Sequence, residues 1–474
     1  MTRPQKLLIA NRGEIAVRII RACAEMDIRS VAIYSDADRH ALHVKKADQA
    51  VPLGPDPVAG YLNVKNIVDL AVRHECDLLH PGYGFLSENP ALAEECEKRG
   101  VRFIGPSAKV IRQMGDKTQA LKAAKDAGLP IIPGSHGNLE SLDHAIAMAK
   151  EIGYPVMLKA TSGGGGRGIR RCDNEEDLRK SYERVISEVT KAFGSAEIFM
   201  EKCIVNPRHI EVQILADKHG NVIHLNERDC SIQRRNQKLI EIAPSPQLTV
   251  QQRLHVCQLA VNLAKAVGYQ NAGTVEFLLD QNGQFYFMEM NTRVQVEHTI
   301  TETITGVDIV QEMIQIANGG KLSYKQVDVN HRGFSIQFRI NAEDPAKGFV
   351  PSFGRITRYY APGGPGIRTD SAIYTGYDVP PYFDSMLAKV IVWALTWEDV
   401  VNRSSRALKD MEVFGIKSTI PYYQKILESP EFKSGNFTTS FVESTPQLAE
   451  YSQKERKDMR ATALAAAIAV YAGW

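Results

Sequence analysis

The stretch from Thr274 to Glu297 holds residues whose types and spacing suit metal-dependent chemistry. It reads TVEFLLDQNGQFYFMEMNTRVQVE, in which two runs of strand-forming residues flank a turn signal at Asn282-Gly283. If these two residues form the turn, Glu276 faces Glu289 on one side of a β-hairpin, with Cβ atoms about 5 Å apart. Facing carboxylates destabilise a sheet unless a positive charge lies between them. The hairpin therefore favours a bound cation.

Further polar residues follow Glu289 at alternate positions, and an extended chain carries them along the same face. They are Asn291, Arg293, Gln295 and Glu297. Two carboxylates and the amide of Asn291 are hard oxygen ligands, which suit Mg²⁺ or Mn²⁺ shared with substrate phosphates. The alternative is a solvated hairpin whose glutamates only keep an exposed face polar. The hairpin alone leaves both open.

Length and composition predict a soluble protein of two or three domains. The chain has 474 residues, 44% hydrophobic and 24% charged, with a net charge of +2. Its seven cysteines form no CxxC pair and no zinc-type cluster, which favours free thiols in a reducing cytoplasm. The N-terminus has no signal-peptide pattern, and no apolar run is long enough to cross a bilayer. We expect a cytoplasmic protein without a membrane or nucleic-acid partner.

The first 115 residues alternate short apolar runs with amphipathic stretches. The runs KLLIA, SVAIY, CDLLH and VRFIG look like buried strands, so a parallel sheet covered by helices is expected. Ligands of such sheets lie beyond the carboxyl ends of the strands. Two loops, 11–14 and 80–85, take such positions. Ordinary strand-to-helix turns explain each loop equally well.

A glycine-rich loop, TSGGGGRG at 161–168, follows a strand that ends in Lys159. Its glycines match GxGxxG, but strands flank it on both sides, whereas a dinucleotide fingerprint needs a helix directly after the glycines. The chain contains no GxxxxGK[ST] motif. A strand-flanked glycine loop closes over nucleotide phosphates in protein kinases, and Lys159 supplies a point charge for phosphate. The alternative is a floppy surface loop.

Residues 197–238 add candidate contacts for a nucleotide and for a small anion. HIEVQIL alternates strictly, which places His209 and Glu211 on one polar face. The segment 201–204 lies between two strand-like runs, where an adenine can meet backbone groups. The run 233–238 is dense in cationic and amide donors and lacks interleaved aromatic residues, so it suits a small oxyanion better than nucleic acid. A solvated basic turn is the alternative.

The C-terminal third contains short strands and then helices. SIQFRIN places Arg339 on a polar face with its neighbours at alternate positions. A last helix is expected after the capping box of Ser452 and Glu455, with Leu464, Ile468 and Tyr471 on one face. We expect this helix to pack on its own domain, and docking on a partner is the alternative.

With these residues identified, the chain resembles a biotin carboxylase, the ATP-grasp component of biotin-dependent carboxylases. The resemblance runs to about residue 445 and rests on IANRGEIAVRIIRA, HPGYGFLSEN, GGGGRG, ERDCS with QRR and QK, and EMNTRVQVEH. It implies an α/β fold, α+β in its C-terminal part. The implied parts are a Rossmann-like domain at 1–115, an ATP-grasp domain at 116–330 with a mobile lid at about 134–203, a C-terminal mixed β/α domain at 331–445, and an extension at 446–474.

The resemblance also implies roles for individual residues. The residues expected to bind ATP are Lys117, Lys159, Gly165, Gly166, Glu201, Lys202, Cys203, Ile204, His209, Asn236, Glu276 and Glu289. The expected ligands of Mg²⁺ or Mn²⁺, with two ions implied, are Glu276, Glu289 and Asn291. The expected bicarbonate contacts are Lys238, Arg293, Gln295 and Val296. Glu297 is implied as the general base, Arg339 as the cation that stabilises the biotin enolate, and Tyr83 and Gly84 as neighbours of the biotin ring.

Two positions depart from the family pattern. Asn236 stands where histidine is common, although asparagine still donates and accepts hydrogen bonds. Thr161-Ser162 replaces a more glycine-rich start of the lid loop. The expected chemistry nevertheless holds together, because phosphorylation of bicarbonate needs cations around the phosphates and a lid that excludes water.

The resemblance further implies biotin carried on a separate carboxyltransferase subunit, and a homodimer. The chain contains no Met-Lys-Met biotinyl motif. Thr299, where acetyl-CoA-type subunits usually have proline, and the C-terminal extension favour the biotin carboxylase subunit of a two-subunit pyruvate carboxylase. Acetyl-CoA or another acyl-CoA carboxylase is the alternative. A non-catalytic nucleotide-binding subunit is an alternative of another class, but it predicts a lost metal ligand or base.

Overall fold

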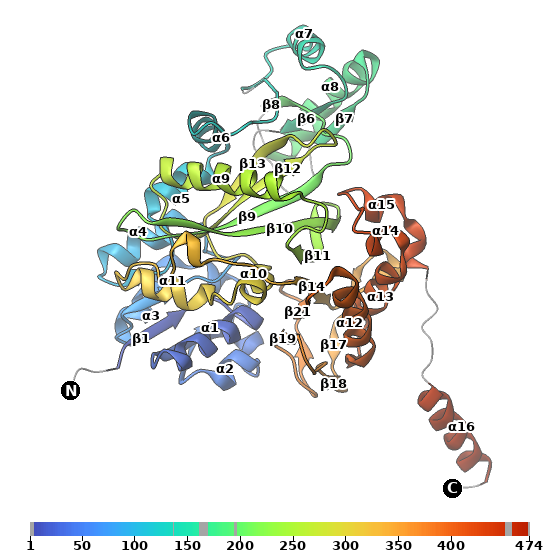
Figure 1. Ribbon diagram of the computed structural model, residues 1–474. Helices are drawn as coiled ribbons and strands as arrows, with labels where there is room; N and C mark the ends of the chain where they lie inside the picture. The colour runs from blue at the N-terminus through green and yellow to red at the C-terminus, as the bar shows by residue number, and fades with distance from the viewer. Residues whose placement is uncertain (1–3, 136, 161–168, 194–196, 451–456, 473–474) are drawn as a thin grey trace.

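Five parallel strands form the sheet at the N-terminal end of the chain (Figure 1). The structure, a computed structural model, describes residues 4–135, 137–160, 169–193, 197–450 and 457–472. The sheet has the order β3-β2-β1-β4-β5, with β1 (Lys6–Ile9), β2 (Arg29–Ser35), β3 (Gln49–Gly54), β4 (Leu78–His80) and β5 (Arg102–Phe103). Its helices are α1 (Gly13–Glu25), α2 (Leu42–Lys46), α3 (Val64–Arg73), α4 (Pro90–Lys98) and α5 (Ala108–Gly115). The expected parallel sheet is confirmed.

Strand β3 was not expected from the sequence. It lies at the edge of the sheet, is mostly exposed or half-buried, and contains Pro52, which lacks the amide that a central strand needs. An edge strand of this kind lacks the apolar run that marks the inner strands β1, β2 and β4. The edge position of β3 therefore explains why the sequence pattern did not predict it.

The loops after β1 and β4 lie side by side, because these strands are neighbours where the strand order reverses. Asn11 Nδ2 donates to the carbonyl oxygens of Pro81 at 2.7 Å and Tyr83 at 2.8 Å. Gly82 has a φ of +64°, and a Cβ added there would lie 2.8 Å from Asn11 Nδ2. Glycine at position 82 therefore allows the two loops to close on each other.

An eight-stranded sheet forms the middle of the molecule, with the order β13-β12-β9-β10-β11-β14-β21-β19 (Figure 1). Its strands are β9 (Arg208–Ala216), β10 (Val222–Arg234), β11 (Gln237–Ala243), β12 (Asn271–Leu279), β13 (Phe285–Asn291), β14 (Phe334–Asn341), β19 (Ile367–Ser371) and β21 (Met386–Ala394). The helices α9 (Val250–Ala266), α10 (His298–Thr305) and α11 (Ile309–Ala317) contact this sheet. Strands on both sides of residue 330 are thus hydrogen-bonded in one sheet.

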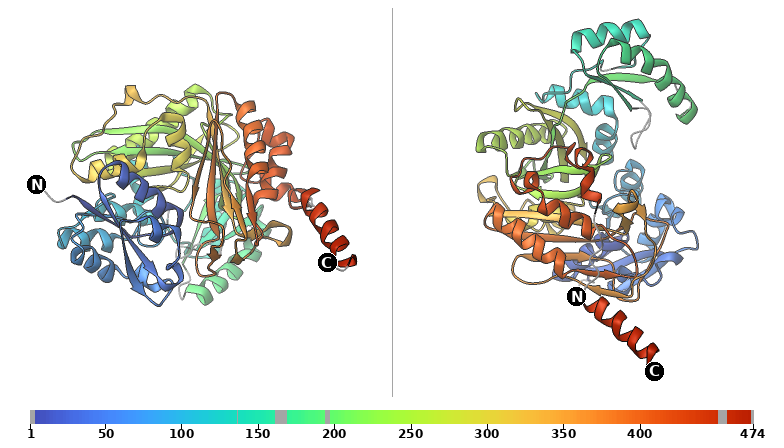
Figure 2. Two further views of the ribbon diagram at one scale, coloured as in Figure 1. Left: turned by 90° about the horizontal axis from the view of Figure 1, so that it is seen from below. Right: turned by 90° about the vertical axis from the view of Figure 1, so that its right-hand side faces the viewer.

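A smaller unit with its own apolar core stands away from this sheet (Figures 1 and 2). Its three-stranded sheet has the order β7-β6-β8, formed by β6 (Val156–Ala160), β7 (Ile169–Cys172) and β8 (Ile198–Lys202). Helices α7 (Leu142–Ile152) and α8 (Glu175–Phe193) cover it, and α6 (Lys117–Asp126) precedes it. Lys159 pairs with Ile169 in antiparallel register. The expected strands on both sides of the glycine loop are confirmed, while residues 161–168 lie outside the described residues.

The remaining elements pack on the far end of the central sheet. They are β15 (Glu343–Asp344), β16 (Val350–Pro351), β17 (Gly354–Arg355), β18 (Arg358–Tyr360), β20 (Asp378–Val379), β22 (Glu412–Phe414), α12 (Trp397–Asp410), α13 (Ile420–Glu428), α14 (Pro430–Lys433) and α15 (Phe441–Ser444). Leu448 follows α15 and completes the same apolar core. Among the described residues, no helix is both long and apolar enough to cross a membrane.

The last helix, α16 (Lys457–Tyr471), extends away from the body (Figures 1 and 2). The expected helix is confirmed, and its capping box lies outside the described residues. Leu464 is 65% exposed, Ile468 60% and Tyr471 96%. The expectation that this face packs on its own domain is therefore wrong. The spacing predicts an apolar face, but it does not say which surface covers that face.

Buried histidines give this fold a predicted sensitivity to acid. Burial lowers the pKa of His43 to about 4, and the nearby Asp38 does not offset this. In the unfolded chain the pKa is about 6.5. The stability contributed by neutral His43 is complete above that value and falls as the pH drops toward 4, by up to about 1.4 kcal/mol per pH unit.

Between pH 6 and pH 4.5, we expect His43→Gln to reduce the slope of the free energy of unfolding against pH by up to about 1.4 kcal/mol per pH unit. Urea unfolding of the variant and of the unmodified protein at half-unit pH intervals measures the effect. Parallel stability curves for the two proteins would show that His43 is not held neutral in the fold.

Candidate active site

The predicted pairing of Glu276 with Glu289 is present in the hairpin of β12 and β13. The predicted turn is different, because the Asp280 amide donates to the Gln284 carbonyl at 3.0 Å and encloses three residues instead of two. The last of them, Gly283, has a φ of +84°, as three-residue hairpin loops require.

A β-bulge restores the predicted register beyond the turn. The pairs shift by one residue between Glu276–Glu289 and Phe277–Phe287, so Met288 is the additional residue on β13. The longer turn and the bulge cancel each other. The two glutamates therefore face each other as predicted, although the turn between them was wrong.

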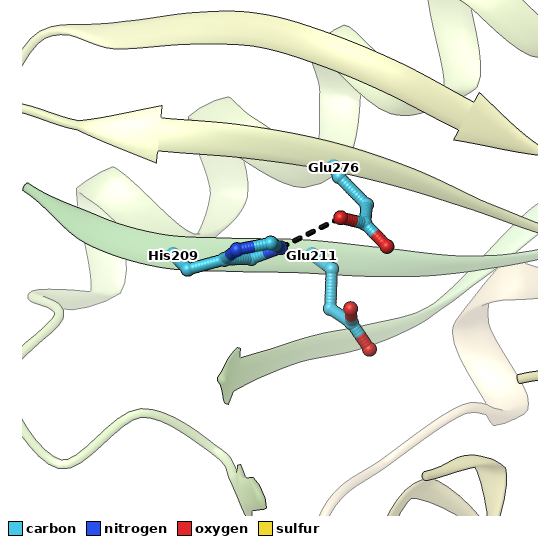
Figure 3. Close-up of side chains that lie close together, drawn as sticks. All are labelled: His209, Glu211 and Glu276. Atoms are coloured by element: carbon cyan, nitrogen blue, oxygen red, sulfur yellow. Dashed lines mark ion pairs between the residues drawn. The ribbon is translucent and has the colours of Figure 1, made fainter. Parts of the chain in front are cut away.

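Glu276 also lies directly opposite Glu211 of the neighbouring strand β9. Three carboxylates, from Glu211, Glu276 and Glu289, thus follow one row across three strands. Figure 3 shows His209 and Glu211 on one strand and Glu276 on the next, with His209 Nε2 2.7 Å from Glu276 Oε2. Like charges placed opposite each other destabilise a sheet, so this row needs positive charge.

Lys238 supplies part of that charge. Its Nζ donates to Glu276 Oε1 at 2.9 Å, to Glu297 Oε1 at 2.8 Å, and to Glu211. Burial alone would lower the pKa of Lys238, but the three carboxylates raise it well above its usual value. The fully buried Arg228 forms an ion pair with the other carboxylate oxygen of Glu211. Lys238 therefore links the row of carboxylates that could bind a metal to Glu297, the expected base.

The chain leaves the β-ladder after Asn291, so the expected extended strand does not continue to Glu297. The side chains nevertheless converge. Asn291 Nδ2 and Gln295 Nε2 donate to Glu276 Oε1 at 2.8 and 3.0 Å. Arg293 donates to the Asn291 and Gln295 side-chain oxygens, each at 2.8 Å. Side-chain hydrogen bonds therefore bring together the residues that the alternating pattern of an extended strand predicted on one face.

Arg339 reaches the same point from β14. Its Nη2 donates to Glu297 Oε2 at 3.1 Å, and its Nε donates to buried Glu241. Burial alone would raise the pKa of Glu297, but Lys238, Arg339 and Arg228 outweigh it and hold this pKa well below its usual value. Glu297 is thus a carboxylate at neutral pH, and each of its oxygens accepts from a cation.

The charges of this site fit a divalent cation. Five carboxylates, Glu211, Glu241, Glu276, Glu289 and Glu297, face three cations, Arg228, Lys238 and Arg339. Two negative charges are uncompensated among these groups. In agreement, desolvation and the neighbouring carboxylates Glu276 and Glu297 raise the pKa values of Glu289 and Glu241, respectively. An oxygen-rich donor set with this surplus suits Mg²⁺ or Mn²⁺.

The candidate nucleotide residues lie between the small unit and the central sheet. Lys159 forms an ion pair with Glu201, and Lys117 Nζ lies 3.8 Å from Glu201 and 4.1 Å from the centre of the Phe199 ring. Burial lowers the pKa of Lys117, and Glu201 partly offsets this. A cavity of about 250 Å³ lies here, lined in part by Lys117, Phe199 and Glu201.

The backbone of residues 201–204 is partly occupied by internal hydrogen bonds. The amides of Lys202 and Cys203 donate to the carbonyls of Pro133 at 2.7 Å and Pro155 at 2.9 Å. An adenine would therefore meet carbonyls or Ile204 in this segment and not these two amides. Gly165 and Gly166, expected at the phosphates, lie outside the described residues.

Asn236 lies at the tip of the hairpin between β10 and β11. Arg234 pairs with Gln237, and the two turn residues, Arg235 and Asn236, have φ values of 49° and 63°. This left-handed conformation at both positions is the type I′ pattern, in which asparagine is favoured. Turn geometry thus accounts for asparagine at this position.

The loop expected beside biotin is tied to the base by a buried chain of contacts. Tyr83 donates its hydroxyl to Glu14, whose other oxygen lies 3.0 Å from Lys389 Nζ. Lys389 Nζ also donates to the carbonyl of Val296 at 3.0 Å, directly before Glu297 in the chain. Neither Glu14 nor Lys389 was among the predicted site residues.

Comparisons with known proteins agree with this site. Three family models match in order: "Biotin carboxylase, N-terminal domain" at residues 3–111, "Carbamoyl-phosphate synthase L chain, ATP binding domain" at 116–325, and "Biotin carboxylase C-terminal domain" at 337–444. The small subunit of 2-oxoglutarate carboxylase from Hydrogenobacter thermophilus is 53% identical over 99% of both chains. The chain belongs to the biotin carboxylase family. It is a ligase that uses ATP to carboxylate biotin with bicarbonate.

Two other relatives of this biotin carboxylase differ in how much of their length it matches. Biotin carboxylase 1 of Bacillus subtilis is 53% identical, covering 93% of this chain and 98% of that protein. A pyruvate carboxylase subunit of Methanothermobacter thermautotrophicus is 50% identical, covering 92% of this chain and 89% of that protein. The crystal structure of the H. thermophilus 2-oxoglutarate carboxylase biotin carboxylase domain dimer, with MgADP, ADP and bicarbonate, has a TM-score of 0.90 and 54% identity, covering 96% of this chain and 100% of that one.

Several residues of this biotin carboxylase site went unassigned in the sequence. They are Glu14, Glu88, Glu211, Arg228, Glu241 and Lys389. Glu88 accepts from Arg293 Nε at 2.9 Å, which links the loop after β4 to the hairpin. The alternation of HIEVQIL gave a signal for Glu211. Arg228 gave none, because its strand also reads as ordinary surface. Lys389 gave an unused signal, since it is the one charged residue in the apolar run MLAKVIVWAL.

Proposed function

We propose that this chain is the biotin carboxylase subunit of a two-subunit 2-oxo acid carboxylase, acting on biotin carried by its partner. The observation that supports this most is the match to the H. thermophilus small subunit over 99% of both chains, which includes most of the C-terminal extension. A dedicated biotin carboxylase such as that of B. subtilis matches only 93% of this chain.

We take 2-oxoglutarate as the first candidate for the final carboxyl acceptor and pyruvate as the second. The match through the extension favours 2-oxoglutarate. Pyruvate is supported by Thr299, which is buried and donates its hydroxyl to Gln337, and by the 50% identity to the pyruvate carboxylase subunit of M. thermautotrophicus. An acyl-CoA acceptor has the weaker support, since proline is expected at position 299 in that class.

The site residues divide the reaction among them in this proposal. Glu276, Glu289 and Asn291 hold the divalent cation, which neutralises phosphate charge when bound. The residues assigned to ATP are Lys117, Lys159, Gly165, Gly166, Glu201, Lys202, Cys203, Ile204, His209 and Asn236. Lys238, Arg293, Gln295 and the Val296 backbone bind bicarbonate. Because Lys238 contacts both Glu276 and Glu297, it places the anion between phosphate and base.

In the first step, bicarbonate gives its proton to Glu297, and its oxygen forms a bond to the γ-phosphorus of ATP as the bond to ADP breaks. The product is carboxyphosphate. A bound anion competes for Lys238 and Arg339, so it weakens their hold on Glu297 and raises the basicity of that carboxylate. In the second step the bond between the carboxyl carbon and the phosphate oxygen breaks, the carboxyl group bonds to N1 of biotin, and the departing phosphate takes the N1 proton. Arg339 stabilises the biotin enolate, and Tyr83 and Gly84 lie beside the ring.

Two assays test this function in sequence. With free biotin, bicarbonate and MgATP, the isolated chain should release ADP only when biotin is present. With the biotinylated partner, transfer to 2-oxoglutarate, pyruvate and acetyl-CoA is then compared. Carboxylation of acetyl-CoA alone would reject the 2-oxo acid assignment. Absence of biotin-dependent ADP release would instead favour a non-catalytic subunit.

A homodimer is proposed for the chain in solution. The support is the H. thermophilus domain, which is 54% identical and was crystallised as a dimer. Size-exclusion chromatography with light scattering measures the mass directly. A mass of about 53 kDa at micromolar concentration would reject the dimer, because it equals that of one 52.6 kDa chain.

A reducing compartment suits this chain, and we propose the cytoplasm. Its seven cysteines are free thiols, and six of them are buried. Free buried thiols persist where glutathione and thioredoxin keep them reduced.

A further inference from the structure

Helix α16 presents an apolar face that the rest of the described chain leaves exposed. Leu464, Ile468 and Tyr471 follow the i, i+4, i+7 spacing of one helical face, and each is at least 60% exposed. The twelve residues 461–472 contain no charged side chain. A helix of 15 residues is marginal in water by itself, so tertiary or quaternary packing must supply its stability. We therefore expect the apolar face of α16 to pack against another protein surface.

The relatives indicate which partner this is. The small subunit from H. thermophilus aligns over 469 residues, so it has residues in line with α16. B. subtilis biotin carboxylase 1 leaves only 2% of its own length unaligned, too little for a helix of 15 residues. The pyruvate carboxylase subunit from M. thermautotrophicus leaves 11% of its own length unaligned, which is enough for one. Among these three relatives, the additional chain accompanies the two that are named as subunits.

We propose that α16 docks, through Leu464, Ile468 and Tyr471, in an apolar groove of the biotin-bearing partner subunit. This inference rests on the proposed two-subunit function. Docking by this C-terminal helix holds the partner to the enzyme and raises the local concentration of carrier biotin at the active site. A second copy of this chain is the competing occupant.

Matched substitutions on opposite faces of α16 test the proposal. The double variant L464D/I468D places two charges on the proposed face. The control A466D/V470D has the same i, i+4 spacing about 160° around the helix, and both of its positions are exposed; Val470 is the large apolar residue outside the proposed face. Full-length chains are titrated with the purified biotinylated subunit, which streptavidin identifies, and light scattering gives the mass of each chain alone.

We expect L464D/I468D to raise the apparent Kd for the partner at least tenfold. Placing charges in an apolar contact should cost as much binding free energy as the loss of a hot-spot residue. The control should stay within about twofold, and both should keep full ADP release with free biotin. Unchanged partner binding by L464D/I468D would overturn the proposal, as would a changed dimer mass. If the unmodified chain releases ADP with biotin but does not bind the partner, the two-subunit function itself is wrong.

A second inference rests on Lys389, which is fully buried on β21. It lies directly opposite Arg339 in the β14–β21 ladder, so the two side chains leave the sheet on the same face. Its ammonium lies 3.0 Å from both the Val296 carbonyl and Glu14. Glu14 in turn accepts the Tyr83 hydroxyl. One buried charge thus joins the expected biotin loop to the residue before the base.

We infer that Lys389 is a positioning residue, which fixes the Val296–Glu297 peptide relative to Tyr83. It touches neither bicarbonate nor biotin in the proposed arrangement. Its loss should therefore change the use of biotin and leave the nucleotide site as it is. The nucleotide residues Lys117 and Lys159 lie on other elements, α6 and β6.

The variants K389M and K389M/E14Q distinguish an effect of Lys389 on the position of the Val296–Glu297 peptide from an effect on the stability of the fold. K389M alone leaves the Glu14 carboxylate buried without its cation, so it should melt early. K389M/E14Q removes both charges and should regain most of the melting temperature. We expect the double variant still to lose at least tenfold in kcat/KM for free biotin, with KM for MgATP within about twofold. The control R253M/E227Q removes another ion pair, in which Glu227 points to the opposite side of β10 from Arg228, and should keep both constants.

A normal kcat/KM for biotin in K389M/E14Q would overturn the inference. So would equal losses for biotin and MgATP, because those would indicate a general structural defect.

Discussion

Glu297→Gln is expected to lower biotin-dependent ADP release by about 10²- to 10⁴-fold, the usual range for loss of a general base. Glutamine keeps the shape of the side chain, but its single oxygen accepts from only one of Lys238 and Arg339, and it cannot take the bicarbonate proton. The fold should survive, because Glu211, Glu241 and Glu276 still pair with Lys238 and Arg339 after Glu297 is neutralised. Steady-state ADP release with free biotin measures the effect, and MgATP binding should remain within about threefold.

The control for this variant is Glu227→Gln. Glu227 is also fully buried and bonded to a cation, Arg253, at 2.8 Å, but it lies outside the site. We expect Glu227→Gln to lower the melting temperature and to keep the rate per folded molecule. A Glu297→Gln enzyme as fast as the unmodified protein would remove Glu297 from its role as base.

Glu276→Gln is expected to lower the rate by about 10²- to 10³-fold, comparable to losing one electrostatic stabiliser of a transition state. Burial alone would raise the pKa of Glu276, but Lys238 and His209 lower it strongly, so its carboxylate carries a full charge. It is also the centre of the row between Glu211 and Glu289. Its neutralisation removes an expected metal ligand that also accepts a hydrogen bond from Lys238.

Mn²⁺ binding with ATP, followed by electron paramagnetic resonance, gives a readout apart from activity. We expect Glu276→Gln to weaken Mn²⁺ binding at least tenfold, whereas Glu227→Gln should bind it normally. Unchanged Mn²⁺ affinity in Glu276→Gln would contradict the assignment of the metal site to this row.

The two central glutamates were predicted from a turn that the structure does not contain. The prediction succeeded because the three-residue loop ending at Gly283 and the bulge at Met288 shift the register in opposite directions. Sequence pattern specifies which face of a strand is polar, but bulges are set by local backbone geometry. Agreement at Glu276 and Glu289 therefore came from the polar pattern and from two cancelling shifts.

Contacts across distant strands were beyond the sequence. Arg228 and Lys389 lie inside because β10 and β21 are central strands of an eight-stranded sheet, and alternation alone does not give strand order. The face of α16 was recognised, and its surroundings were not, because an apolar face is the same signal for a domain core and for a partner. The parallel N-terminal sheet was predictable, since buried strands leave continuous apolar runs.

Transfer of ¹⁸O from bicarbonate to phosphate tests the central claim most directly. If bicarbonate attacks the γ-phosphorus within this site, each turnover with free biotin leaves one bicarbonate oxygen in the released phosphate. We predict one ¹⁸O atom per phosphate from fully labelled bicarbonate in unlabelled water, in proportion to the ADP formed. Released phosphate without the label, at a normal rate of biotin-dependent ADP release, would contradict this mechanism.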